Sequence, residues 1–200
     1  MRNRKNDYWK TVTGKRVVFF LLILFVVLIN FCSVQIAEFL QIPFFFDTWG
    51  TTLGVLVGGL AVGLVGGIVY NLIMMTVWGT SAWVWAFANI WVAIIVTILN
   101  RKGWISIKYP GKLFVSGIIV GLTTAIVIII ILFTAWGGVE TYEGVLPTYD
   151  ALLDVTGSKT IAAVGEKFIT TPFDQIVSLF LAAIVYSALP SKFILNRRKK

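Results

Sequence analysis

The sequence predicts an all-α membrane protein, with six transmembrane helices in one bundle that fills residues 1–200 as a single integral-membrane domain. Residues 48–100 contain no Asp, Glu, Lys or Arg, and as one helix they would be about 80 Å long, against a hydrocarbon core of about 30 Å. The chain is 58% hydrophobic and only 13% charged, which is unlike a soluble domain. Its basic residues gather near predicted helix ends, as topology signals do.

The apolar run at 44–77 is too long for one ordinary span, and dividing it near Leu60 gives two. With this division the basic clusters at 2–16, 101–112 and 192–200 all face one side, which the positive-inside rule makes the cytoplasm. The first run is too long for a typical signal peptide, so we expect a retained span. The predicted spans are 17–34, 44–60, 61–77, 83–99, 113–136 and 173–189, with both termini cytoplasmic in a multi-pass protein of the bacterial plasma membrane.

The connection at 137–171 is then outside and is rich in acidic residues. It is too long to be a plain connector, and such connections are usually functional or structured. We expect a short helix at 148–155, stopped by Gly157, and a second one at 160–168. Together these would form a structured outer loop, or cap, between the fifth and sixth spans.

Glycines recur every four residues in the second and third predicted spans. Small residues at this spacing let another helix backbone approach closely. Packing inside the bundle is the commoner use of the pattern, and docking of another membrane subunit is the alternative. The positions are Gly50, Gly54, Gly58, Gly59, Gly63 and Gly67.

Asp47 and Asp174 are the acidic residues nearest the apolar core, and each is predicted at the outer end of a span. An ionisable group in that position is a functional hypothesis by default. A structural role competes with it. Thr171 suits the N-cap of the last predicted span, and Pro172 suits its first helical position, which would put Asp174 in the first turn. Asp47 is suitably placed to cap the second span.

Trp85 and Asn89 are predicted one turn apart on the same face of the fourth span. A flat ring beside an amide suits a small heterocycle, because stacking supplies affinity and the amide supplies orientation. The alternative is a bundle contact with an interhelical hydrogen bond. Most of the other tryptophans fall near span ends, which is the usual aromatic-belt placement.

The composition argues against catalysis and cofactor binding. The chain has one Cys and no His, which excludes a nitrogen or sulfur metal site, and we expect no cofactor. There is no phosphate-binding glycine loop, because residues 157–160 have only the ending of that motif. The net charge of +8 is confined to helix ends, so nucleic acid is not an expected partner, whereas membrane lipid is. We therefore expect that the chain is not an enzyme.

Three stretches carry a resemblance to a known family. Residues 42–51 read IPFFFDTWGT, residues 60–72 carry a Gly/Ala pattern ending in Tyr70-Asn71-Leu72, and residues 171–190 begin TPFDQIVS and end ALP. They resemble the second, third and last helices of the substrate-binding S components of energy-coupling factor (ECF) vitamin importers. The resemblance implies capture of a vitamin-like small molecule at the outer face and delivery inward with a membrane coupling protein and two cytoplasmic ATPases, which hydrolyse the ATP.

The same resemblance places the ligand near the outer ends of the later helices. The candidate substrate-binding residues in that region are Asp47, Trp49, Trp85, Asn89, Tyr142, Tyr149 and Asp174. Two features depart from the family. The first span lacks its usual small residues, so the docking face would lie elsewhere, for example on the glycine pattern. Gln175 also stands where related chains often have Lys.

Two alternatives from other classes remain open. One is a stand-alone carrier or channel for small solutes, and the other is a membrane sensor or assembly scaffold. The aromatic residues and two acids favour a small, flat, amine-bearing heterocycle as the substrate.

Overall fold

A computed structural model describes residues 12–42, 44–138, 146–190 and 194–195 of the chain. Throughout these residues the regular structure is helical. The elements are α1 (Val12–Phe39), α2 (Trp49–Gly58), α3 (Leu60–Trp78), the 3₁₀ helix η3 (Thr80–Trp85), α4 (Ala86–Arg101), α5 (Pro110–Trp136), α6 (Leu146–Thr156) and α7 (Lys159–Ala188).

Five helical segments are long and apolar enough to cross a membrane. They are Gly14–Phe39, Leu60–Val77, Ser81–Arg101, Pro110–Trp136 and Lys159–Ala188. The all-helical, multi-pass membrane class is therefore as predicted. The remaining predicted span corresponds to α2, which has only 10 residues. At about 15 Å, α2 is too short to cross a bilayer by itself.

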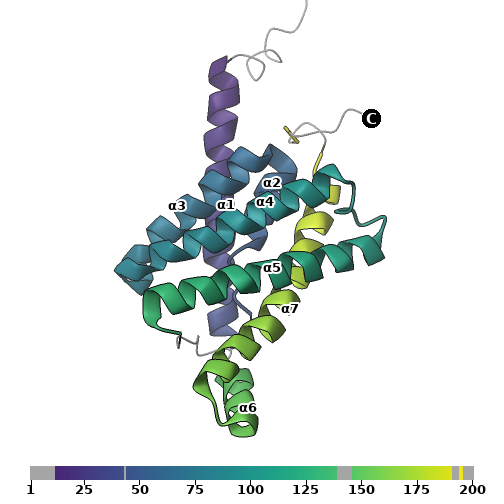
Figure 1. The fold of residues 1–200 in the computed structure, drawn as a ribbon. Helices are drawn as coiled ribbons and strands as arrows, with labels where there is room; N and C mark the ends of the chain where they lie inside the picture. The colour runs from purple at the N-terminus through teal and green to yellow at the C-terminus, as the bar shows by residue number, and fades with distance from the viewer. Residues whose placement is uncertain (1–11, 43, 139–145, 191–193, 196–200) are drawn as a thin grey trace, which may run out of the picture.

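Figure 1 shows how the helices are arranged. The start of α1 and the end of α7 lie at the top, whereas α6 and the first turns of α7 form a hairpin at the bottom. Between them α3, α4 and α5 lie side by side and cross α1 obliquely. We call the two ends of the molecule the α6 end and the terminal end. The short α2 is central, since it contacts α1, α3, α4 and α7.

The break between α2 and α3 lies at Gly59, next to the predicted division near Leu60. Gly59 has φ +88°, a conformation that side-chain-bearing residues rarely adopt. Its N–H still donates to the Val55 carbonyl, and its own carbonyl accepts from Val62 and Gly63, so the backbone remains hydrogen-bonded through the break.

Glycines allow the close helix contacts of this fold. A Cβ at Gly54 or Gly66 would lie 2.5 or 2.6 Å from the Val26 side chain of α1. In α5, a Cβ at Gly121 would lie 2.3 Å from the Cα of Pro172 in α7. Four further predicted positions also face atoms of this chain closely: Gly50, Gly58, Gly63 and Gly67. The glycine faces of α2 and α3 are thus occupied within the chain.

The predicted start of the last span is wrong. Helix α7 runs without interruption through Pro172, and it includes both the predicted short helix at 160–168 and the predicted span at 173–189. Thr171 and Asp174 are consequently mid-helix residues and not part of an N-cap. A proline inside a membrane helix is tolerated where a neighbouring helix packs against it, here α5 at Gly121. The helix expected before Gly157 is confirmed as α6.

Candidate functional site

The chain leaves α1 at Phe39 and turns back into the bundle as the non-helical residues 44–48, which we call the re-entrant segment. Gln41 and Phe46 have φ +52° and +50°, in the left-handed region that non-glycine residues seldom occupy. Such backbone conformations persist only where the surroundings hold them, and they concentrate at functional sites.

Hydrogen bonds to α1 fix how deep the re-entrant segment reaches. The Gly50 N–H donates to Asn30 Oδ1 at 2.8 Å, and the Trp49 indole N–H donates to Ser33 Oγ. Asn30 lies more than two turns before the end of α1 at Phe39. The start of α2, which bonds to Asn30, therefore lies about 13 Å further along the α1 axis than that end of the helix. Residues 44–48 therefore reach into the α6 half of the molecule, where Thr48 is buried and residues 44–47 are half-buried.

The re-entrant segment meets α7 at two consecutive residues. The Phe46 N–H donates to Asp174 Oδ1 at 3.1 Å. The Gln175 side-chain amide donates to Thr48 Oγ1 at 2.8 Å and to Asp174 Oδ2 at 3.1 Å. Asp47 stands between these two anchor points, close enough for its charge to act on Asp174. Two acidic residues that are distant in sequence thus share one place in the bundle.

Two buried polar atoms near this acid pair, on Tyr70 and Gln175, have no hydrogen-bond partner among the described residues. Tyr70 of α3 is fully buried, its hydroxyl has no hydrogen-bond partner among the described residues, and the charge of Asp47 acts on it. Gln175 Oε1, beside Asp174, also has no partner in the described part of the chain, and neither do Asn71 Oδ1 of α3 and Thr171 Oγ1 of α7, all on buried residues. Buried polar groups are normally paired, so such a concentration needs an explanation.

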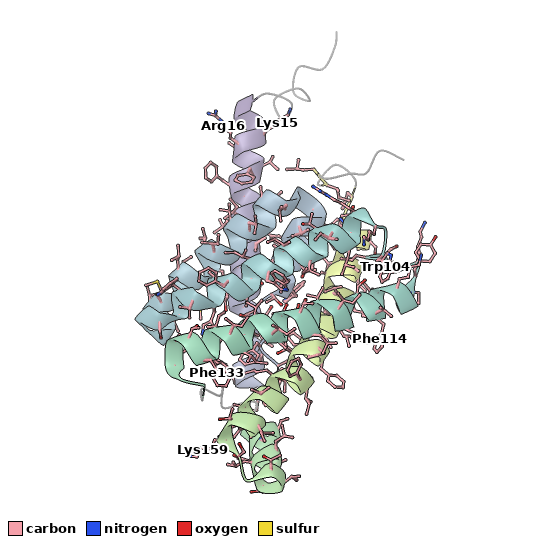
Figure 2. All side chains as sticks on the ribbon, in the orientation of Figure 1. Lys15, Arg16, Trp104, Phe114, Phe133 and Lys159 are labelled. Atoms are coloured by element: carbon pink, nitrogen blue, oxygen red, sulfur yellow. The ribbon has the colours of Figure 1, made fainter. Side chains whose placement is uncertain are left out.

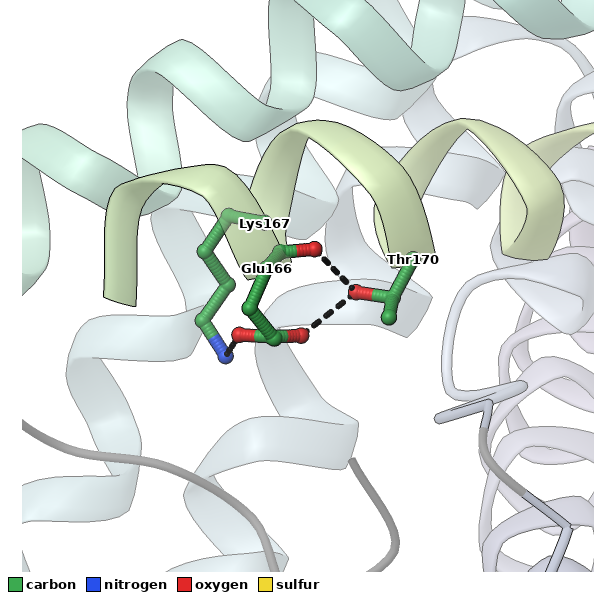
Figure 3. Close-up of polar contacts among 3 residues, drawn as sticks. All are labelled: Glu166, Lys167 and Thr170. Carbon is green, nitrogen blue, oxygen red and sulfur yellow. Dashed lines mark hydrogen bonds and ion pairs between the residues drawn. The ribbon is translucent and has the colours of Figure 1, made fainter. Parts of the chain in front are cut away.

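Towards the α6 end, α7 carries a buried ion pair (Figure 3). Lys167 Nζ lies 2.7 Å from Glu166 Oε2, and the Thr170 hydroxyl donates to Glu166 Oε1 at 2.6 Å. The ammonium group also lies 5.3 Å from the centre of the Phe45 ring in the re-entrant segment. The positive charge of Lys167 is therefore matched locally by Glu166 and an aromatic face.

On the terminal side of the acid pair, a chain of polar side chains links three helices. Asn30 of α1 donates to Thr51 Oγ1 at 3.0 Å, and the Thr51 hydroxyl donates to Asn89 Oδ1 of α4 at 2.5 Å. Gly67 of α3 lies behind this chain, where a Cβ would be 2.9 Å from Asn89 Cβ. The Asn89 amide nitrogen has no partner among the described residues. The interior thus presents three polar layers, one above another.

The structure brings only some of the predicted site residues together. Asp47 and Asp174 lie close together, Trp49 is anchored to Ser33 nearby, and Asn89 belongs to the polar layer on the terminal side. Trp85 lies in η3 and stacks on Trp136 with ring centres 5.3 Å apart. Asn89 instead accepts a hydrogen bond from Thr51.

Three further expectations need correction or fall outside the description. Tyr149 is buried in a small cluster between α6 and α7, against Ala162 and Ala163, where it packs the hairpin. The N-cap residue of α2 is Thr48 and not Asp47. Tyr142 lies outside the described residues.

Sequence reasoning missed several members of the site. Asn30 is the only amide residue in the otherwise apolar run at 17–34, and this signal was available. Glu166 and Lys167 were counted as charges of an outer loop, because the extent of α7 was not foreseen. Thr48 and Tyr70 gave no distinctive signal.

The site suits non-covalent binding of a small molecule by hydrogen bonds and charge. No group of three or more His, Cys, Asp or Glu residues that could hold a metal ion occurs in the part of the chain that the structure describes. Comparison with family models, curated proteins and solved structures finds no match to this chain.

Proposed function

We propose that this chain is the substrate-specific binding subunit of an ATP-driven ECF-type importer, which captures a vitamin-like small molecule at the outer face of the membrane. The observation that carries the proposal is the buried polar site around Asp47 and Asp174, with its unpartnered Tyr70 hydroxyl and Gln175 oxygen. A bundle whose only task was structural would be more stable with apolar side chains in these places.

The backbone at this site also supports binding. Non-helical backbone at membrane depth is tolerated where it is buried in protein or lines a cavity, and solute transporters commonly place broken helices at their substrate sites. In our proposal the re-entrant segment and α2 together make the sixth crossing. The α6 end then faces outward, and the basic clusters face the cytoplasm.

In this proposal, ligand binding and ATP hydrolysis take place on different subunits. The ligand enters beneath the α6–α7 hairpin and binds between the re-entrant segment, α3 and α7. Hydrolysis of ATP takes place on separate cytoplasmic subunits, which a membrane coupling protein links to this chain. The resemblance of residues 42–51, 60–72 and 171–190 to S components favours this arrangement.

Affinity purification of the tagged chain from its native membranes in mild detergent, with mass spectrometry of the partners, tests the proposal. We expect two related ATPases and a second membrane protein. Recovery of the chain alone, while ECF subunits are detected in the same membranes, would contradict it.

A stand-alone carrier is the second candidate, favoured by the acid pair itself. Side-by-side acids inside a membrane protein are typical of proton or ion coupling. This candidate predicts solute uptake by proteoliposomes that contain only this chain, driven by a Na⁺ or H⁺ gradient. The importer proposal predicts no such uptake until the coupling protein, the ATPases and ATP are present.

A further inference from the structure

We infer that the ligand of this site is an organic cation, a small amine-bearing or cationic heterocyclic molecule whose positive charge lies between Asp47 and Asp174. The inference rests on the proposed binding function and names the substrate class. It starts from the charges and unpartnered atoms that the fold gathers in one place.

The interior of the α6 half carries more negative than positive charge. Asp47 and Asp174 lie close together, since the Phe46 N–H next to Asp47 donates to Asp174 Oδ1. Among the described residues Lys167 is the only buried basic one, and Glu166 already pairs with it. The buried Asp174 and the half-buried Asp47 are thus left without a protein counter-charge among the described residues, in a place where an opposite charge is attracted more strongly than in bulk water.

The remaining basic residues of the described chain are too distant to serve. Lys15 and Arg16 lie at the terminal end, opposite Lys159 at the tip of the α6–α7 hairpin (Figure 2). The others belong to the connection at 101–112 and its flanking turns.

Unpartnered polar atoms beside the acids point to a ligand independently of charge. The Gln175 amide nitrogen is held between Asp174 and Thr48, so the oxygen of the same planar group lies next to the acid pair, and it has no partner. Gln175 is only 1% exposed. The buried Tyr70 hydroxyl is likewise unpaired. An ammonium or a protonated ring nitrogen donates hydrogen bonds that such oxygens accept.

Aromatic residues around the site favour an organic cation over a metal ion. Phe44 and Phe46 of the re-entrant segment form an edge-to-face pair with ring centres 5.7 Å apart, and Trp49 follows. The neighbouring Phe45 ring already faces one ammonium group, that of Lys167. Aromatic faces attract organic cations, whereas hard metal ions seek several oxygen ligands.

The test measures equilibrium binding to the full chain in nanodiscs, with two probes in each charge class. Thiamine and 1-methylnicotinamide are cationic, riboflavin and nicotinamide are neutral, and biotin and nicotinate are anionic. We expect the tightest binder to be cationic. Asp174→Asn should weaken its binding at least about 30-fold, as removal of one partner of a buried charge pair does. Asp154→Asn, on the exposed face of α6, is the matched control and should leave binding within about two-fold.

Thermal unfolding of each variant is measured in parallel, and Asp47→Asn replaces Asp174→Asn if the latter does not fold. A neutral or anionic tightest binder, or a cation whose binding neither substitution weakens, would overturn the inference. The binding function would still stand if the ATPases and coupling protein are recovered. If no probe binds, the inference fails, and if no partners are recovered either, the proposed function fails with it.

Discussion

The two halves of this bundle differ in backbone geometry and in the charged groups that they contain. In the terminal half, residues 53–57 of α2 are packed in an apolar core, and several polar groups bond to carbonyls of their own helix, as Thr97 does to Ala93 and Ser116 to Lys112. In the α6 half, the chain abandons helical geometry at 44–48, places Phe46 at positive φ, and holds the buried Asp174, the half-buried Asp47 and a buried ion pair.

This difference shows where the fold is built for stability and where it is built for function. The terminal half follows the rules of local propensity and packing. The α6 half departs from several of them within a few residues, and such concentrated departures are typical of functional sites. The comparison predicts that substitutions in the packed seams will affect folding, whereas substitutions at the acid pair will affect binding.

The largest effect is expected at the seam between α5 and α7. Gly121→Val would place side-chain atoms against the backbone of Pro172, which cannot move aside without displacing α7. We expect overpacking of at least about 3 kcal/mol and loss of monodisperse protein in detergent size-exclusion chromatography. Gly111→Val in the first turn of α5 is the control, because nothing lies within 4 Å of a Cβ there. Equal behaviour of the two variants would refute the close seam.

The next largest effect concerns the buried ion pair. Lys167→Met leaves the Glu166 carboxylate buried without a counter-charge, and we expect about 3 kcal/mol lower free energy of unfolding. Combining it with Glu166→Gln should recover most of this loss, because the stranded charge is removed. Denaturant unfolding of the two single variants and the double variant measures the coupling. If the two single-variant losses of unfolding free energy simply added in the double variant, Glu166 and Lys167 would not be energetically coupled.

A smaller effect is expected where the two halves join. Asn30→Ala removes the acceptor of the Gly50 N–H and the donor to Thr51, at a cost of about 2 kcal/mol. Cys32→Ala, at an exposed position on the same helix, should change stability by less than about 0.5 kcal/mol. Thermal unfolding in one detergent compares them, and a harmless Asn30→Ala would mean that the junction does not hold α2 in place.

The smallest effect separates the site from the aromatic residues around it. Trp85 stacks on Trp136 and has no role in the proposed site, so Trp85→Leu should cost only about 1 kcal/mol of stability. Titration in nanodiscs should show that the Trp85→Leu chain binds the tightest-binding probe with an affinity within about two-fold of that of the unaltered chain. A loss of binding as large as that of Asp174→Asn would bring Trp85 into the site.

How much the sequence predicts differs between these halves for physical reasons. Charge-free length and basic clusters predict membrane helices well, because the bilayer imposes the same length and polarity on every span. The re-entrant segment could not be foreseen, since the apolar residues Phe44 to Phe46 suit a helix as well as a buried extended strand. Pro172 was taken as a helix start because the tertiary contact with Gly121 that accommodates it is invisible in the sequence.

The candidate site was predicted only in part, again because tertiary contacts are invisible in the sequence. Asp47 and Asp174 stand out as charges in apolar surroundings, and the structure brings them together. The neighbouring Thr48, Tyr70 and Gln175 are ordinary polar residues, and only the return of the chain into the bundle brings them near the acids.

Hydrogen–deuterium exchange of the full chain in nanodiscs, with and without a saturating concentration of the tightest-binding probe, tests the central claim most directly. The account predicts slower exchange in residues 44–50 and in the middle of α7 on binding, with residues 53–57 of α2 unchanged because they are already fully packed. Protection confined to other segments, with no change at 44–50, would contradict the claim that the α6 half holds the binding site.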